Sequence, residues 1–318
     1  IGEELSLDRK NTVDVIKKLG LHTKRFVFNQ RDTKKIFKNL LENYDWPPSS
    51  LLYSWMESGF PGFIIFYPPR TKGTLQEAFH VVPIIGHTLN TDSWQPEADI
   101  QYKRKVDLHF RSVSAWVDNF IIHDDNFGMY LCYPTSKLSE REKNIGYLVD
   151  FVLFITENEI DFPPDAVEIN LISSIRQLFK SLRKISPSDD IWNYRIVNDK
   201  TPLVSRTLLA TKEDYIESLG EKDSESNNIP EKTRKEITQQ LPNKFWLTEI
   251  TLPDLYIANK TALISIASEL STGNPCFIRL PGLCLFINER SAVESVVLPT
   301  MSHYKIFAMK NDNETFDW

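Results

Sequence analysis

Two apolar runs of strand length, each ending in groups that can titrate, most strongly constrain how this chain can fold. The first covers residues 79–87 and reads Phe-His-Val-Val-Pro-Ile-Ile-Gly-His; the second covers residues 120–125 and reads Phe-Ile-Ile-His-Asp-Asp. Continuous apolar runs of this length are typical of buried β-strands. If the two strands are neighbours in one sheet, an imidazole and a carboxylate come within hydrogen-bond reach. That is the geometry of a general base and the group that orients it.

The rest of the chain predicts both helices and strands, so we expect an α+β fold. Apolar residues with helical spacing predict helices that begin near Asn11 or Thr12, near Asp32, at residue 51, and at a capping box formed by Asp165 and Glu168. Strands are predicted at 21–28, 62–67, 78–86, 115–123, 129–133, 147–156, 191–197, 203–210, 245–252, 276–280 and 283–288. Since Pro83 cannot donate a ladder hydrogen bond, we expect it at a sheet edge, a bulge or a strand end.

A change in pattern divides the chain into two expected domains. The polar segment 186–190 (Ser-Pro-Ser-Asp-Asp) separates residues 1–187 from a smaller, β-rich domain at residues 188–318. Residues 222–239 are polar, without an apolar period, and predict a mobile connector. Residues 87–112 have no sustained period either, and we interpret them as an insertion of the kind that often forms a lid or a binding loop.

Charge and composition exclude several classes of function. The net charge of −6 and the pI near 5.6, with no dense basic cluster, argue against a nucleic-acid-binding protein. No apolar segment reaches the roughly 18 residues that a membrane-spanning helix needs. The three cysteines (Cys132, Cys276 and Cys284) are scattered without a CxxC motif, so we expect no disulfide framework and a cytoplasmic location.

The order of the segments in the first half of the chain is similar to that of a known family. A helix, a strand and a helix precede residues 57–66 (Glu-Ser-Gly-Phe-Pro-Gly-Phe-Ile-Ile-Phe), which are followed by the His80 strand and then by a strand that ends in Asp124. Over about residues 10–135 this order resembles the papain-like cysteine peptidase fold as used by the double-glycine leader peptidases, which process bacteriocins. The resemblance implies that His80 is the catalytic histidine and that Asp124 orients it.

The same resemblance implies a cysteine nucleophile at the start of a long helix and an oxyanion-hole glutamine shortly before it, both N-terminal to His80. No cysteine precedes Cys132, so we expect the nucleophile upstream of Ile1. The resemblance implies no metal ion and no organic cofactor. The predicted function is that of a thiol-dependent hydrolase or peptidase that acts on an amide bond in a peptide or protein substrate.

Two other classes of function stay open. One is a binding or assembly module that keeps the papain-like fold without its chemistry. The other is a metal-dependent hydrolase, since imidazoles and carboxylates suit zinc or iron, although HxH and HExxH spacings are absent. The residues considered as ligands are His87, His123, Asp124 and Asp125, with His80 or His109.

Several residues have a structural interpretation beside a functional one. We expect Asp125 to point away from Asp124 if the strand pleat continues. Cys132 is expected to be an inert core thiol, and Glu249 a structural partner inside a buried strand. Three of the tryptophans either line a cleft near His80, pack in the core or belong to a solvent-facing lid; they are Trp55, Trp94 and Trp116.

Overall fold

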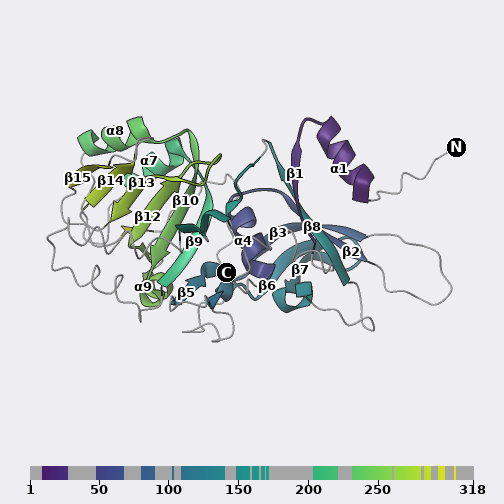
Figure 1. Cartoon of the computed structure of the whole chain (residues 1–318). Helices are drawn as coiled ribbons and strands as arrows, with labels where there is room; N and C mark the ends of the chain where they lie inside the picture. The colour runs from purple at the N-terminus through teal and green to yellow at the C-terminus, as the bar shows by residue number, and fades with distance from the viewer. Residues whose placement is uncertain are drawn as a thin grey trace, which may run out of the picture.

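Two large β-sheets lie side by side in the computed structural model, with one helix between them (Figure 1), and two further short strands form a small sheet of their own. Helices and mostly antiparallel sheets together confirm the predicted α+β class. The structure describes residues 9–27, 48–67, 80–89, 102–103, 109–139, 148–157, 160–164, 166–168, 170–171, 203–220, 231–259, 261–280, 283–287, 293–297 and 304–305. No helix in these ranges is long and apolar enough to cross a lipid bilayer.

The first sheet is antiparallel throughout its described pairs. Its strands, in spatial order, are β1 (His22–Val27), β8 (Leu148–Thr156), β2 (Gly62–Tyr67), β3 (His80–His87), β6 (Asn119–Asp124) and β7 (Gly128–Pro134). The bounds of β2 match the predicted strand, because this apolar run is preceded by Gly59 and followed by Pro68-Pro69, which favour turns and end regular structure. Pro83 lies in a strand with neighbours on both sides, next to the register shift between Ile84 and Gly86 that interrupts the β3–β6 ladder.

Helix α4 (Pro48–Glu57) is the element between the sheets, and it is buried on all sides over residues 52–55. Trp55 shows why, because its ring packs at 5.9 Å from Phe154 of the first sheet and at 6.5 Å from Trp246 of the second. A helix that is apolar all round needs partners on more than one face. The helix ends at Glu57, and Gly59, two residues later, stops it from continuing with a φ of +75°.

The second sheet is antiparallel except where β5 runs parallel to β9. Its strands, in spatial order, are β15 (Val293–Val297), β14 (Leu283–Ile287), β13 (Pro275–Leu280), β12 (Ile264–Ser268), β10 (Lys244–Thr251), β9 (Leu203–Thr211), β5 (His109–Ser112) and β4 (Tyr102–Lys103). Helices α7 (Lys212–Gly220) and α8 (Glu231–Gln240) cover one face (Figure 1). Successive residues of β10 alternate, so Phe245 packs under these helices and Trp246 faces the other core cluster.

The remaining described elements are short or peripheral. Helix α1 packs on the outer face of the first sheet through Ile16, against Ile65, Phe151 and Leu153. These elements are α1 (Arg9–Lys18), the 3₁₀ helices η2 (Val113–Trp116) and η3 (Thr135–Ser139), α9 (Pro253–Asn259), β11 (Thr261–Ala262) and β16 (Tyr304–Lys305).

Two segments without apolar period contain regular structure that the pattern did not predict. Part of the supposed insertion at 87–112 forms β4 and β5, which extend the second sheet. Part of the supposed connector at 222–239 forms helix α8, because Ile237 and Leu241 anchor it to the core while Glu231 and Lys235 pair on its surface. The expected strand at 115–123 begins later, at Asn119, after η2.

Other expectations fall wholly or partly outside the described residues. These are the helix that begins at Asp32, most of the helix that follows Asp165, the strand at 191–197 and the domain boundary near residue 187. In the described sheets, strands from residues 22–156 build the first and strands from residue 203 onward build most of the second, which also includes β4 and β5. Of the predicted capping box, Glu168 lies within the described residues, where its side chain is buried and accepts a hydrogen bond from Ser205 at 2.5 Å.

Candidate functional site

His80 and Asp124 meet at one end of the first sheet. Strands β3 and β6 are antiparallel neighbours, so the start of one lies beside the end of the other. His80 is the first residue of β3, Asp124 is the last residue of β6, and His80 Nε2 lies 3.1 Å from Asp124 Oδ2. The two side chains are therefore within hydrogen-bond distance across adjoining strands, as the sequence suggested.

The Asp124 carboxylate is held in place by the turn that follows it. Its side chain is only 5% exposed, and Oδ1 accepts hydrogen bonds from the backbone N–H groups of Asn126 at 2.8 Å and Phe127 at 3.2 Å. Burial alone would raise the pKa of Asp124, but these backbone hydrogen bonds, together with His80, outweigh it and lower the pKa below its usual value. Asp124 is thus ionised at neutral pH, with Oδ2 directed at His80.

Asp125 lies on the same side as Asp124, which contradicts the expectation that it would point away. Its Oδ1 is 3.6 Å from His80 Nε2, and its side chain is 81% exposed. Strand β6 ends at Asp124 and residues 125–127 form a turn, so the alternation of the strand no longer applies. The side-chain amide of Asn126 also lies 3.4 Å from Nε2. Three consecutive polar side chains, from the last residue of β6 and the turn after it, therefore converge on a single imidazole nitrogen.

The His80 ring has an aromatic neighbour that restricts its orientation. Phe66 of β2 stacks on the imidazole with the ring centroids 6.3 Å apart, and Tyr133 of β7 packs edge-on against Phe66. The His80 side chain keeps 15% of its surface exposed. The imidazole is therefore positioned by the sheet and still accessible from solvent.

None of the described cysteines is placed beside His80. Cys132 pairs with Ile121, so it lies on the face of the first sheet opposite to Phe120 and Ile122. It is exposed, because β7 is an edge strand, and the expected core position is wrong for this residue. The other two cysteines belong to the second sheet, where burial raises the pKa of Cys276 to about 11 and that of Cys284 to about 12.

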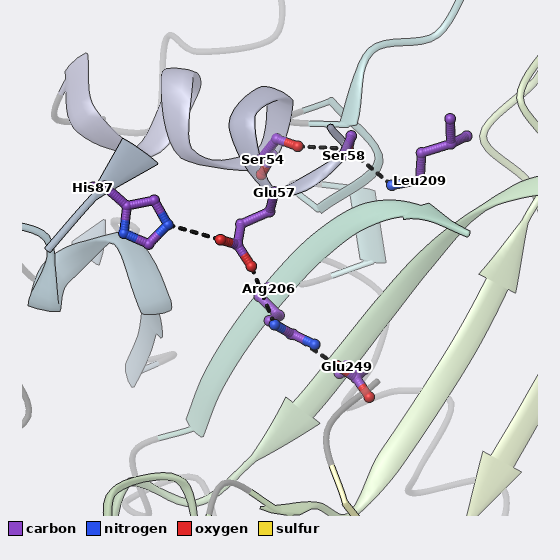
Figure 2. Close-up of polar contacts among 7 residues, drawn as sticks. All are labelled: Ser54, Glu57, Ser58, His87, Arg206, Leu209 and Glu249. Atoms are coloured by element: carbon purple, nitrogen blue, oxygen red, sulfur yellow. Dashed lines mark hydrogen bonds and ion pairs between the residues drawn. The ribbon is translucent and has the colours of Figure 1, made fainter. Parts of the chain in front are cut away.

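A second group of charged side chains links the two sheets (Figure 2). At the end of α4, Glu57 Oε1 accepts a hydrogen bond from His87 Nε2 at 2.7 Å, and Oε2 lies 3.3 Å from Arg206 Nη1. Arg206 Nε in turn donates to Glu249 Oε2 at 2.8 Å. The order His87, Glu57, Arg206 and Glu249, which we call the linking network, leads from β3 through α4 to β9 and β10.

The linking network is suited to holding the sheets together, because its charged groups pair with one another from elements of both sheets. Burial pushes the pKa of Glu57 upward, but the hydrogen bond from His87 and the charge of Arg206 outweigh it and lower that pKa. Burial and the nearby Glu57 raise the pKa of Tyr53, so this phenol stays neutral. A cavity of about 10 Å³ borders Arg206 and Glu249, which is space for a single water molecule.

Ser58 adds a neutral hydrogen-bonded contact between the end of α4 and the second sheet (Figure 2). Its hydroxyl donates to the carbonyl oxygen of Ser54 at 2.6 Å and accepts the backbone N–H of Leu209 at 2.8 Å. Strand β5 pairs with β9 only as far as Ser205, so the amide of Leu209 lies beyond the end of β5. The serine thus replaces a missing strand neighbour.

Glu249 was expected to be a structural partner, but the other members of this network were not predicted. Arg206 is the one charged residue of β9, a largely buried strand, and a charge in such a position signals a buried partner. Its partners cannot be chosen from sequence, since Glu57 and Glu249 lie far from it along the chain.

Of the residues considered as metal ligands, the structure brings three together and separates others. Possible donor atoms from His80, Asp124 and Asp125 lie within 4.8 Å of one another. His87 is engaged with Glu57, and His109 belongs to the second sheet. Trp55 and Trp116 are buried core residues, while Trp94 lies outside the described residues.

Comparisons of the chain with protein-family models, with curated proteins and with solved structures each return no significant match. The function must therefore be inferred from the residues and their geometry.

Proposed function

We propose that this chain carries the histidine and the carboxylate of a thiol-dependent hydrolase that acts on an amide bond in a peptide or protein. The observation that carries the proposal is the 3.1 Å contact between His80 Nε2 and an Asp124 carboxylate that two backbone N–H groups hold in place. An ionised, oriented carboxylate beside a partly exposed imidazole is the arrangement that general acid–base catalysis needs.

The roles follow from which imidazole nitrogen faces the carboxylate. His80 Nε2–H donates to Asp124, which fixes the tautomer that carries its lone pair on Nδ1. In the first step, Nδ1 takes the proton of a cysteine thiol, and Asp124 stabilises the imidazolium that forms. In the second, the thiolate attacks the carbonyl carbon of the amide, and the imidazolium gives its proton to the amine as the C–N bond breaks. Water then hydrolyses the thioester with His80 again as the base, which releases the acid and restores the thiol. The nucleophile in this proposal is a cysteine N-terminal to Ile1.

The finer fold assignment is part of the same proposal. Residues 10–135 have a papain-like arrangement in which helices pack on an antiparallel sheet and the histidine and aspartate come from neighbouring strands. The packing of α4 on β2 and β8, through Trp55 and Phe154, supports this assignment. The order of His80 before Asp124 along the chain also supports it.

A thiol-labelling experiment tests the proposed roles. The full-length protein is treated with an electrophilic thiol probe, and we expect His80→Ala to abolish fast labelling while the melting temperature stays nearly unchanged. His123→Ala is the matched control, because His123 lies on β6 beside Asp124 but is exposed. Asp124→Asn should lower turnover by about 10²-fold or more, and Asp125→Asn far less. Unchanged labelling in His80→Ala, or equal effects of the two aspartate variants, would contradict the assignment.

A non-catalytic binding module is the second candidate, and one observation favours it. The hairpin formed by β6 and β7 exposes large apolar side chains at an edge of the first sheet, among them Phe127, Met129 and Tyr130. Exposed apolar residues on an edge strand are typical of surfaces that bind other proteins. A full-length protein in which no cysteine is labelled faster than in His80→Ala would favour this candidate over the hydrolase.

A further inference from the structure

The cluster of His80, Asp124 and Asp125 has the composition of a transition-metal site. An imidazole nitrogen and two carboxylate oxygens are donors that zinc prefers in proteins. The three donors come from the first residue of β3, the last residue of β6 and the turn that follows it. They are His80 Nε2, Asp124 Oδ2 and Asp125 Oδ1, from three residues that offer donors within 4.8 Å of one another.

The measured separations fit the coordination sphere of one small ion. Zinc–ligand bonds of about 2.0–2.1 Å at tetrahedral angles place neighbouring donor atoms about 3.3 Å apart. His80 Nε2 lies 3.1 Å from the Asp124 oxygen and 3.6 Å from the Asp125 oxygen. The two carboxylates need only approach each other, and Asp125, which is 81% exposed, can rotate to do so.

A single hydrogen bond from His80 does not satisfy all the polar side chains that surround its Nε2 atom. Nε2 can donate one hydrogen, yet the carboxylates of Asp124 and Asp125 and the amide of Asn126 all face it. With a neutral imidazole, two carboxylate charges lie side by side. A divalent cation among them compensates both charges and uses all three donor atoms.

The neighbouring groups orient the donors as the outer shell of a metal site does. The Asn126 and Phe127 backbone amides occupy Asp124 Oδ1, so Asp124 presents only Oδ2 to an ion. Phe66 stacks on the His80 ring and fixes the direction of Nε2. Three protein ligands leave a fourth tetrahedral position for a water molecule.

We propose that His80, Asp124 and Asp125 bind one divalent transition-metal ion, with Zn²⁺ as the representative ion. Binding forms a bond from His80 Nε2 to the metal, and the proton that Nε2 carried moves through solvent to Nδ1, so the imidazole stays neutral. A consequence rests on the proposed function: in the metal-bound form Nδ1 carries that proton and has no lone pair to offer, so His80 cannot act as the base. Zn²⁺ then acts as a reversible inhibitor of the hydrolase.

Isothermal titration calorimetry with ZnCl₂ tests the site without any substrate. The chelator-treated full-length protein is expected to bind Zn²⁺ with micromolar affinity in a ratio of one to one. Loss of an outer-shell partner costs about 10–100-fold in metal affinity, so loss of a ligand in His80→Ala or Asp124→Asn should weaken binding at least as much. His123→Ala, which alters an exposed imidazole next to Asp124 in sequence, should bind as the unchanged protein does.

Circular dichroism spectra of each variant check that it folds, and Asp125→Asn provides a surface substitution that should fold normally and still weaken binding. No binding at millimolar Zn²⁺, or binding that both His80→Ala and Asp125→Asn retain, would overturn the proposed site. Because the titration measures no activity, its outcome is separate from that of the thiol-labelling experiment.

Discussion

Arg206→Met removes the cation that lies between the carboxylates of Glu57 and Glu249 in the linking network. The substitution breaks the 2.8 Å hydrogen bond to Glu249 and the 3.3 Å ion pair with Glu57. Hydrogen bonds to charged groups contribute about 1.5–3 kcal/mol each. The longer interaction falls at the low end of this range, so the two together suggest about 3–5 kcal/mol, which matches the usual cost of breaking a buried ion pair.

The free energy of unfolding, measured by urea denaturation, is the appropriate quantity. Lys244→Met is the matched control, since Lys244 pairs with Glu157 at 3.6 Å with both side chains well exposed, and we expect a decrease of less than about 1 kcal/mol. The double variant Arg206→Met/Glu249→Gln should recover part of the stability, because it no longer leaves the carboxylate of Glu249 buried without its cation.

A small effect would refute this reasoning. If Arg206→Met is destabilised no more than Lys244→Met, water satisfies the two carboxylates and the linking network does not hold the sheets together. If the double variant has a free energy of unfolding about another 3–5 kcal/mol below that of Arg206→Met, the cost of breaking a second buried ion pair, Glu249 has a stabilising role that does not depend on Arg206.

Two further predictions concern packing and pH. A Cβ at Gly62 would lie 2.6 Å from the Phe154 ring, so Gly62→Ala should lower the free energy of unfolding, measured by urea denaturation, by about 1–3 kcal/mol. Gly86→Ala is the control, because the nearest atom to a Cβ there lies at 3.8 Å and no loss of stability is expected. Equal effects of the two substitutions would contradict the packing argument. The pKa of Glu57 is lower in the folded state than in the unfolded state, so its contribution to stability is present above the unfolded-state pKa and is lost as the pH falls through the folded-state pKa. Glu57→Gln should therefore show a smaller fall in melting temperature than the unchanged protein when the pH is lowered below about 4.5. The same dependence of melting temperature on pH in both proteins would contradict this prediction.

Local patterns predicted many of the strands but missed others, among them β12 and β15, and they gave little information on which strands pair. The run Gly62–Tyr67 forms the expected strand because its apolar character and its flanking turn residues are local properties. The pairing of β5 with β9 could not be predicted in this way, since their residues lie about ninety positions apart and β5 has no alternating pattern. Tertiary interactions decide such pairings.

The same division applies to the candidate site. His80 and Asp124 could be predicted to meet because each lies at the end of a recognisable strand. The direction of the Asp125 side chain was predicted wrongly because Asp125 follows the strand. The turn geometry decides which way such a side chain points, and the alternation of side chains along a strand does not describe it. Glu57 and Arg206 were missed because a buried ion pair has no sequence period.

The parallel pairing of β5 with β9 has a practical consequence for anyone who wishes to study the two halves of the chain separately. A fragment that starts after residue 187 would carry β9 without the segment Phe110–Ser112 that pairs with Leu203–Ser205. The backbone groups of that stretch would then be open to intermolecular pairing, which promotes aggregation. Expression of the intact polypeptide avoids this problem, and a fragment design would need to retain residues 109–112.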